Sequence, residues 1–224
     1  MTENKKIHAL LANIPLFSAL QPLEIKHISR GSRVLKVDHG EILFHSGETA
    51  SGFHIMVYGQ IKLAFTSSQG MEKVVRLVEP GECFGDEFMF LDKPYLVSAQ
   101  AITDSCLIYV EKKVLLDAIE QNPGFAHKML GGLSEQLYIL AQDMEAYSLR
   151  SCVQRVIGYL LQSKERKGIL YFNFPATKLI IASYLNISPE TFSRILRELS
   201  AAGLIRVEGK QVAVLDIDRL RVYS

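Results

Sequence analysis

Residues 176–205 read ATKLIIASYLNISPETFSRILRELSAAGLI, and their pattern predicts two helices, at about 176–184 and 189–201, divided by a short turn. Ser188 is a good N-cap residue for the second helix, because its hydroxyl can accept a hydrogen bond from a free backbone N–H of the first turn. Pro189 takes the first helical position, where its missing N–H removes no intrahelical bond. The stretch therefore predicts a helix-turn-helix.

The segments around this helix pair extend the predicted domain on both sides. An amphipathic helix is expected at 153–162, followed by a basic polar loop at 163–168 and a short strand at 169–174. Behind the pair, strands at 204–207 and 211–215 flank a Glu-Gly-Lys turn and form a hairpin. Helix, turn, helix and hairpin follow one another in the order of a winged helix-turn-helix domain.

The second helix of the pair has two distinct faces. Its apolar face, with helical spacing, consists of Phe192, Ile195, Leu196 and Leu199. Its polar face consists of Glu190, Ser193, Arg194 and Arg197. Arginine can donate two hydrogen bonds to guanine and a carboxylate can accept one from cytosine, so the polar face suits base edges in the major groove. The alternative is a salt bridge between Glu190 and Arg194 on a solvated helix, since they are one turn apart.

The first half of the chain has a different pattern. Residues 32–110 contain short apolar runs, such as FHIMVYGQIKLAF at 53–65, punctuated by Gly, Pro, Asp and Ser. Strands of this length between turn residues predict an antiparallel sandwich or roll. One or two short helices are expected before it, with Gln21-Pro22 as a start signal and Gly31 as a stop. The chain is therefore expected to have an α+β fold.

A long helix is predicted between the two parts, from about 125 to 147, after a short helix at 112–120. Apolar residues recur along it at alternating spacings of four and three, which is the period of helices that wind around each other. These residues are Leu133, Leu137, Leu140, Met144 and Tyr147. The seam could pack on the sheet of its own chain, but its period favours a second copy and therefore a homodimer.

Charge is distributed unevenly along the chain. Residues 1–149 hold 13 Lys and Arg against 18 Asp and Glu, whereas residues 150–224 hold 12 against 6. The basic part is the candidate for a polyanionic partner, with a solvated basic surface as the alternative. No apolar run reaches the length of a membrane helix and MTENKKIHAL does not resemble a signal peptide, so we expect a cytoplasmic protein.

Cysteine and histidine spacing does not predict a metal site. Cys83, Cys106 and Cys152 lie far apart, and the six histidines form no HxxxH or HExxH pattern. We therefore expect reduced thiols and no dedicated metal centre. No motif places a nucleophile beside a base, and the adjacent Asp86 and Glu87 are expected to point apart, so we do not expect an enzyme.

Three segments of the chain resemble one known family. SPETFSRILRELSAAGLI, at 188–205, resembles the DNA-binding end of the Crp/Fnr transcription regulators. HSGETASGFHIMVYGQIKL at 45–63 and PGECFGDEFMFLDKPYLVSAQA at 80–101 resemble the cyclic-nucleotide-binding-like β-roll of that family. The resemblance implies an effector domain at 1–118, a dimerisation helix at 119–149 and a winged helix-turn-helix DNA-binding domain at 150–224.

The resemblance also implies partners and a target. Glu190, Ser193 and Arg194 fill the Glu-x-x-Ser-Arg pattern of the Fnr-like branch, whose members bind two-fold symmetric DNA sites with TTGA in each half. The implied partners are double-stranded DNA, a second copy of the chain, a small effector and RNA polymerase, which family members touch through loops corresponding to 66–70 and 163–168. The whole helix is similar to that of the Dnr-type regulators of denitrification, which implies a response to nitrogen oxides. The expected DNA contacts are Ser188, Glu190, Thr191, Ser193, Arg194 and Arg197.

The effector pocket departs from the family pattern. Members that bind cAMP pair its phosphate with the arginine of an Arg-Ser-Ala triplet, and here the triplet is Val97-Ser98-Ala99, which argues against cyclic nucleotide. Fnr itself holds an iron–sulfur cluster through N-terminal cysteines, whereas the first cysteine here is Cys83, which argues against a cluster. Haem or another flat ligand remains a candidate, with His8, His54 and His127 as available axial ligands. The expected pocket residues are Phe84, Gly85, Asp86, Glu87, Phe88, Val97 and Ser98, with Met89 and Phe90 nearby.

The alternative class of function is a nucleotide-binding regulatory subunit that acts on a protein partner. The basic C-terminal domain argues against it, because positive charge on a helix-turn-helix is the expected footprint of a nucleic-acid partner.

Overall fold

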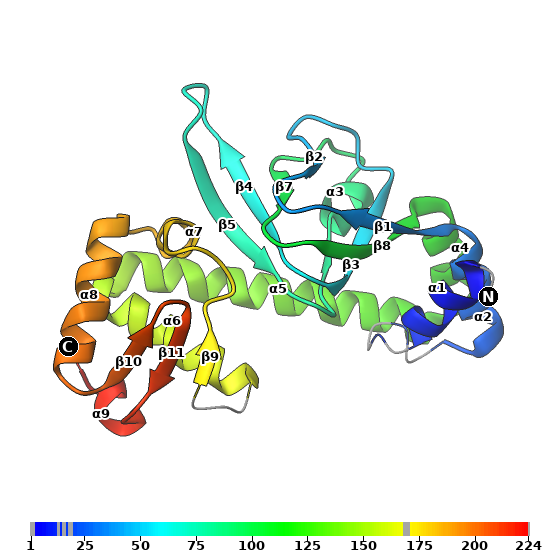
Figure 1. Ribbon diagram of the computed structural model, residues 1–224. Coiled ribbons are helices and arrows are strands. Elements are labelled where there is room, and N and C mark those ends of the chain that lie inside the picture. The colour runs from blue at the N-terminus through cyan, green and yellow to red at the C-terminus, as the bar shows by residue number, and fades with distance from the viewer. Residues whose placement is uncertain (1–2, 13, 15–16, 18–19, 168–170, 224) are drawn as a thin grey trace. The chain divides into compact units, whose positions relative to one another are not determined.

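The computed structural model in Figure 1 describes residues 3–12, 14, 17, 20–167 and 171–223. The chain divides into two compact units, Met1–Tyr138 and Ile139–Ser224. Strands dominate the first unit and helices with a small sheet form the second, so the predicted α+β class is confirmed.

The first unit is built on two antiparallel sheets of four strands each (Figure 1). One sheet contains β1 (Ser32–Val37), β8 (Ser105–Glu111), β3 (Gly52–Tyr58) and β6 (Cys83–Phe84), in that order. The other contains β2 (Ile42–Phe44), β7 (Ser98–Ala101), β4 (Ile61–Thr66) and β5 (Glu72–Val78). Because strands distant in sequence, such as β1 and β8, are neighbours, the chain winds into the predicted roll.

Helices lie before, within and after this roll. They are α1 (Glu3–Ala12), α2 (Pro22–Arg30), α3 (Asp86–Phe90), α4 (Lys112–Gln121) and α5 (Pro123–Leu149). Pro22 occupies the start of α2 and Gly31 its C-cap, as the sequence predicts. Asn122 separates α4 from α5, and its side-chain oxygen accepts a 3.1 Å hydrogen bond from the backbone N–H of Phe125. Packing of α2 on β1 and of α4 on β8 attaches these helices to the sheet.

The second unit has the order of a winged helix-turn-helix, which confirms that prediction. Its helices are α6 (Cys152–Lys167), α7 (Lys178–Tyr184), α8 (Pro189–Ala201) and α9 (Ile217–Arg221). Its sheet has the order β10 (Ile205–Glu208), β11 (Gln211–Val214) and β9 (Tyr171–Asn173). Among the helices that the structure describes, none is both long and apolar enough to span a membrane.

The predicted loop at 163–168 is wrong for residues 163–167, which continue α6. Lys, Glu and Arg are good helix formers, and none of residues 159–167 is a glycine or a proline. Gly168 and the start of the predicted strand at 169–174 lie outside the described residues.

Aromatic side chains fill the interior of the roll. The His54 ring, from β3, stacks on Phe84 with 5.1 Å between ring centroids and lies 5.2 Å from the ring of Tyr109. Phe44, from the opposite sheet, lies 5.6 Å from His54 and stacks on Tyr95 at 3.7 Å. All five side chains are buried, so this cluster joins the two sheets.

Burial makes His54 a neutral base. Desolvation lowers the pKa of His54 to about 3, with a smaller contribution from the nearby Arg33 charge. Among the described atoms, Nδ1 of His54 has no hydrogen-bond partner. The ring is therefore held by stacking rather than by hydrogen bonds through Nδ1.

We expect His54→Phe to remove a pH dependence of stability. Below pH 6.5 the unfolded chain protonates His54, whereas the folded chain keeps it neutral down to about pH 3, so folding loses free energy as the pH falls. At pH 5 this single group should lower the free energy of unfolding by about 2 kcal/mol relative to pH 7. Urea unfolding at both pH values should show that extra loss in the wild type but not in the variant. Equal losses would contradict the neutral state of His54.

Candidate nucleic-acid interface and effector pocket

The start of α8 is set by its own first residues. Ser188 is the N-cap, and its hydroxyl accepts a 3.1 Å hydrogen bond from the backbone N–H of Thr191. Pro189 follows in the first helical position. The sequence prediction for this helix, including its end at 201, is therefore confirmed.

The turn between α7 and α8 depends on Asn186, whose φ of 56° lies in the left-handed region. Asparagine tolerates this conformation better than most residues. In α7 the buried residues are Ile181 and Ala182, and Leu185 is buried just after it. Leu179 is apolar but exposed, with an exposed fraction of 64%. The helix begins only at Lys178, so Leu179 lies in its first turn and faces solvent.

The two faces of α8 separate as predicted. Its buried residues are Phe192, Ile195, Leu196 and Leu199. Of the expected DNA contacts, the exposed ones are Ser188, Glu190, Arg194 and Arg197, while Thr191 and Ser193 are half-buried. Hydrogen bonds from its own backbone and from Ser188 lower the pKa of Glu190. Glu190 is therefore held as a carboxylate at the positive N-terminal end of the helix.

Arg194 has a different partner from the one considered in the sequence. Its Nη1 donates a 2.6 Å hydrogen bond to Oε1 of Glu198, one turn further along α8. Glu190 interacts with Ser188 and its own backbone instead. The sequence interpretation missed Glu198, although its spacing of four residues from Arg194 was a usable signal.

The expected effector residues lie where β6 passes into α3 and where β7 begins. Phe84, Gly85, Asp86 and Val97 are buried, while Glu87, Phe88 and Ser98 are half-buried. Gly85 adopts a φ of 86°, and a side chain there would press against the ring of Tyr95. The Ser98 hydroxyl accepts a 3.0 Å hydrogen bond from the backbone N–H of Ser46.

Asp86 and Glu87 interact, contrary to the expectation that adjacent acids point apart. Burial, the Glu87 charge and a hydrogen bond with Glu87 raise the pKa of Asp86 to about 6, against a smaller opposing effect of its own backbone. The short helix α3 allows this, because consecutive side chains there do not alternate as they do in a strand. Two interacting carboxyl groups therefore lie where β6 passes into α3.

The stacked rings of Phe44 and Tyr95 are the main pocket feature that the sequence interpretation missed. Tyr95 also meets Phe88 edge-on at 5.6 Å. Burial, followed by the Tyr109, Glu87 and Glu48 groups, raises the pKa of Tyr95 to about 12. The aromatic residue two positions before Val97 was a signal that could have indicated this filled interior.

The candidate haem ligands have different surroundings. His54 is buried, His8 is half-buried with Nε2 3.4 Å from the carbonyl oxygen of Pro22, and His127 is exposed. Among the described residues, no group of three or more His, Cys, Asp or Glu side chains is arranged to hold a metal ion.

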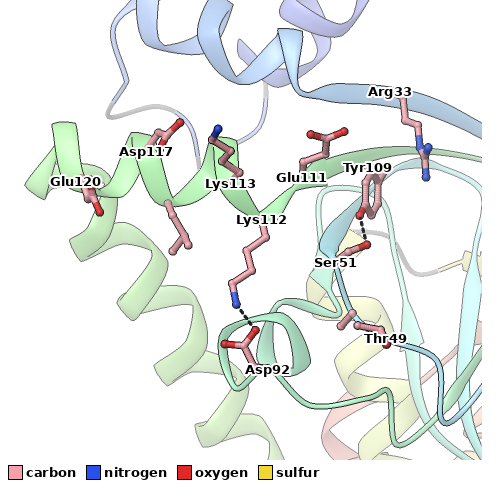
Figure 2. Close-up of a pocket in the computed structure, with 12 residues that line it drawn as sticks. Arg33, Thr49, Ser51, Asp92, Tyr109, Glu111, Lys112, Lys113, Asp117 and Glu120 are labelled. Atoms are coloured by element: carbon pink, nitrogen blue, oxygen red, sulfur yellow. Dashed lines mark hydrogen bonds and ion pairs between the residues drawn. The ribbon is translucent and has the colours of Figure 1, made fainter.

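A separate open groove of about 830 Å³ lies beside α4 and the β2–β3 loop (Figure 2). The guanidinium of Arg33 lies 4.6 Å above the ring of Tyr109, whose hydroxyl forms a 2.8 Å hydrogen bond with Ser51. Lys112 pairs with Asp92 across the groove. The groove carries both signs of charge, and none of the expected effector residues lines it.

The seam of α5 is largely exposed within one chain. Exposed fractions are 68% for Leu137, 55% for Leu140 and 70% for Met144, and Leu133 is half-buried. Leu130, which the sequence interpretation left out, extends the same spacing toward the N-terminus and is also exposed. The side chain of Tyr147 lies outside what the structure describes.

Comparison with known proteins places this fold in a family. A cyclic nucleotide-binding domain model matches residues 34–122, and a Crp-like helix-turn-helix model matches residues 154–223. A CRP-like cAMP-activated global transcriptional regulator of Mycobacterium tuberculosis is 25% identical over 216 residues, covering 94% of this chain and 96% of the relative. The transcriptional activator FnrA of Stutzerimonas stutzeri is 27% identical over 211 residues, covering 91% and 84%.

A solved structure gives the same result over the full length. The crystal structure of DNR from Pseudomonas aeruginosa is 30% identical and covers 100% of both chains, with a TM-score of 0.54. The chain therefore belongs to the Crp/Fnr family of transcription regulators.

Proposed function

We propose that this regulator binds, as a homodimer in the cytoplasm, two-fold symmetric DNA sites with TTGA-like half-sites. The observation that carries the proposal is the polar face of α8, where Glu190, Ser193 and Arg194 lie together on a helix whose other face is buried. A recognition helix in a major groove requires such an arrangement. Two half-sites read by two copies should lie about one helical turn apart.

The polar residues of α8 would divide the contacts between them. Arg194 would donate to the O6 and N7 atoms of guanine, and Glu190 would accept from the amino group of cytosine or adenine. Ser193 would contact a base or a phosphate, and Arg197 a backbone phosphate. Ser188 and Thr191, at the N-terminal end of the helix, are near enough to the same groove to contact the backbone.

Arg194→Ala should weaken binding to a TTGA palindrome by about 1–3 kcal/mol and binding to random DNA far less. Fluorescence anisotropy with both DNAs at one salt concentration measures the difference. Arg219→Ala is a matched control, because Arg219 is an exposed arginine on α9 of the same unit. Equal losses on the two DNAs would mean that Arg194 contacts only phosphate.

The exposed seam of α5 supports the homodimer. Leucines and a methionine with this periodicity leave apolar area in water unless a second helix covers them. A partner copy would cover the same residues on both chains, as an interface with two-fold symmetry requires.

We expect Leu137→Glu to convert the dimer to a monomer, because each copy would bring a carboxylate into the apolar seam. Sedimentation velocity should show the change, and DNA affinity should fall with it. Gln142→Glu is the control, since residue 142 is exposed on the side of α5 away from the seam. A Leu137→Glu variant that remains dimeric would place the interface elsewhere.

Haem and a response to nitrogen oxides form the candidate effector system. The neutral, buried His54 would hold the haem iron through a ring nitrogen, and the surrounding aromatic rings suit a flat apolar group. Tyr95 stacks on Phe44 at 3.7 Å in this interior, so a flat group beside His54 would have to displace the Tyr95 ring. When bound, haem would supply an iron centre for nitric oxide.

Haem titration followed by visible spectroscopy tests this effector. The expected result is a saturable Soret band that shifts on addition of nitric oxide and is absent or displaced in His54→Ala. His39→Ala is the control, because His39 is exposed and is not among the candidate haem ligands. A spectrum equal to that of free haem under all conditions would exclude haem as the effector.

Cyclic nucleotide is not the effector that these residues favour. Val97 stands in place of a phosphate-pairing arginine, and the coupled Asp86 and Glu87 would repel a phosphate. Arg76 is already engaged, since it donates a 3.0 Å hydrogen bond to the carbonyl oxygen of Cys83.

A regulatory subunit that acts on a protein partner is the alternative function, and a gel shift at increasing salt distinguishes the two. DNA binding should weaken steeply as ions compete for the phosphates. Contacts with RNA polymerase would use the 66–70 turn, which lies at the tip of the β4–β5 hairpin, and the 163–168 segment. Neither class requires catalysis.

A further inference from the structure

Glu198 occupies a position on α8 that helix stability does not explain. It lies in the last turn of a helix that ends at Ala201, where the negative end of the helix dipole disfavours a carboxylate. Its salt bridge with Arg194 has the less favourable order, with the cation N-terminal to the acid. Both side chains are also well exposed, 57% for Arg194 and 43% for Glu198, so solvent weakens the pair.

The geometry gives Glu198 a different use. Its carboxylate oxygen Oε1 accepts a 2.6 Å hydrogen bond from Nη1 of Arg194. This contact leaves Nη2 and Nε of the guanidinium available. A guanidinium has five donors in a rigid plane, so fixing one edge fixes the direction of the other. The remaining edge can still donate two parallel hydrogen bonds to guanine.

The carboxylate also affects contacts with the DNA backbone. A free arginine is attracted to any phosphate, which adds affinity without sequence information. An arginine held beside a carboxylate presents almost no net charge, and the carboxylate itself repels phosphates. The pair therefore weakens the non-specific attraction of Arg194 while retaining its hydrogen-bond donors.

We propose that Glu198 is a specificity-determining residue that holds Arg194 for guanine and reduces its contacts with phosphate. This inference rests on the proposed role of Arg194 as the guanine contact. Glu198 acts through Arg194 and is in that sense a positioning residue. Its effect should therefore appear as a change in the discrimination between DNA sequences.

Glu198→Gln is the sharpest variant, because glutamine keeps the length and one acceptor oxygen but removes the charge. Binding to random DNA should tighten by roughly two- to fivefold, the range expected for an exposed charge interaction. The plot of log affinity against log salt should steepen by about 0.9 if Arg194 gains one phosphate contact. The preference for TTGA over TTAA half-sites should fall by a similar factor.

Asp218→Asn is the matched control, because it makes the same charge change at an exposed position on α9. A second measurement uses Arg194→Ala as the background, in which Glu198→Gln should no longer alter discrimination. Thermal unfolding of each variant checks that the unit is folded.

The outcomes separate the two proposals. If Glu198→Gln and Asp218→Asn change random-DNA binding equally and leave the guanine preference intact, Glu198 is only one surface charge and the inference fails. Loss of affinity for both DNAs in Glu198→Gln would also overturn it. If Arg194→Ala weakens binding to TTGA and to random DNA equally, the proposed guanine contact of Arg194 is wrong. The inference about Glu198, which rests on that contact, then falls with it.

Discussion

The burial of one face of α8 is the constraint on which the winged-helix unit depends. Phe192 is fully buried, and its ring lies 5.9 Å from that of Phe174. Rotating the helix to place another residue inside would expose Phe192 at a cost of about 1.5–3 kcal/mol. Backbone hydrogen bonds also fix the segment after α8. The N–H of Leu204 donates to the carbonyl of Leu199, and the N–H of Leu215 donates to the carbonyl of Leu204. The wing is thereby tied to the end of α8.

Burial also determines the chemistry of the roll in the first unit, but there it acts on polar groups. Burial of one face of α8 leaves the charged side chains of its other face, among them Arg194 and Glu198, in water. Burial in the roll instead takes polar groups inside, so His54 becomes neutral and Asp86 holds its proton to about pH 6. The two units thus differ in chemistry, with exposed charges on α8 and buried aromatic and polar groups in the roll.

Periodic features were predictable from the sequence, and contacts between distant side chains were not. The α8 cap at Ser188, its buried face and the exposed seam of α5 follow from local spacing alone. The Phe44–Tyr95 stack joins residues 51 positions apart, through strands whose pairing the sequence does not specify. The Asp86–Glu87 interaction was missed because it depends on α3 being a short helix rather than a strand. The extension of α6 to residue 167 was missed because charged residues were read as a loop, although they favour helix equally well.

The filled interior of the roll also restricts which ligands can compete for it. An incoming group must replace the Phe44–Tyr95 stack, and such aromatic pairs are worth about 0.5–1.5 kcal/mol beyond their buried area. A flat apolar ligand that covers the displaced rings replaces the buried area that they lose, at about 25 cal/mol per Å². A phosphate would instead lose its hydration next to Asp86 and Glu87, with Val97 supplying no compensating charge. A flat apolar ligand therefore has the advantage over an anion before any specific hydrogen bond is formed.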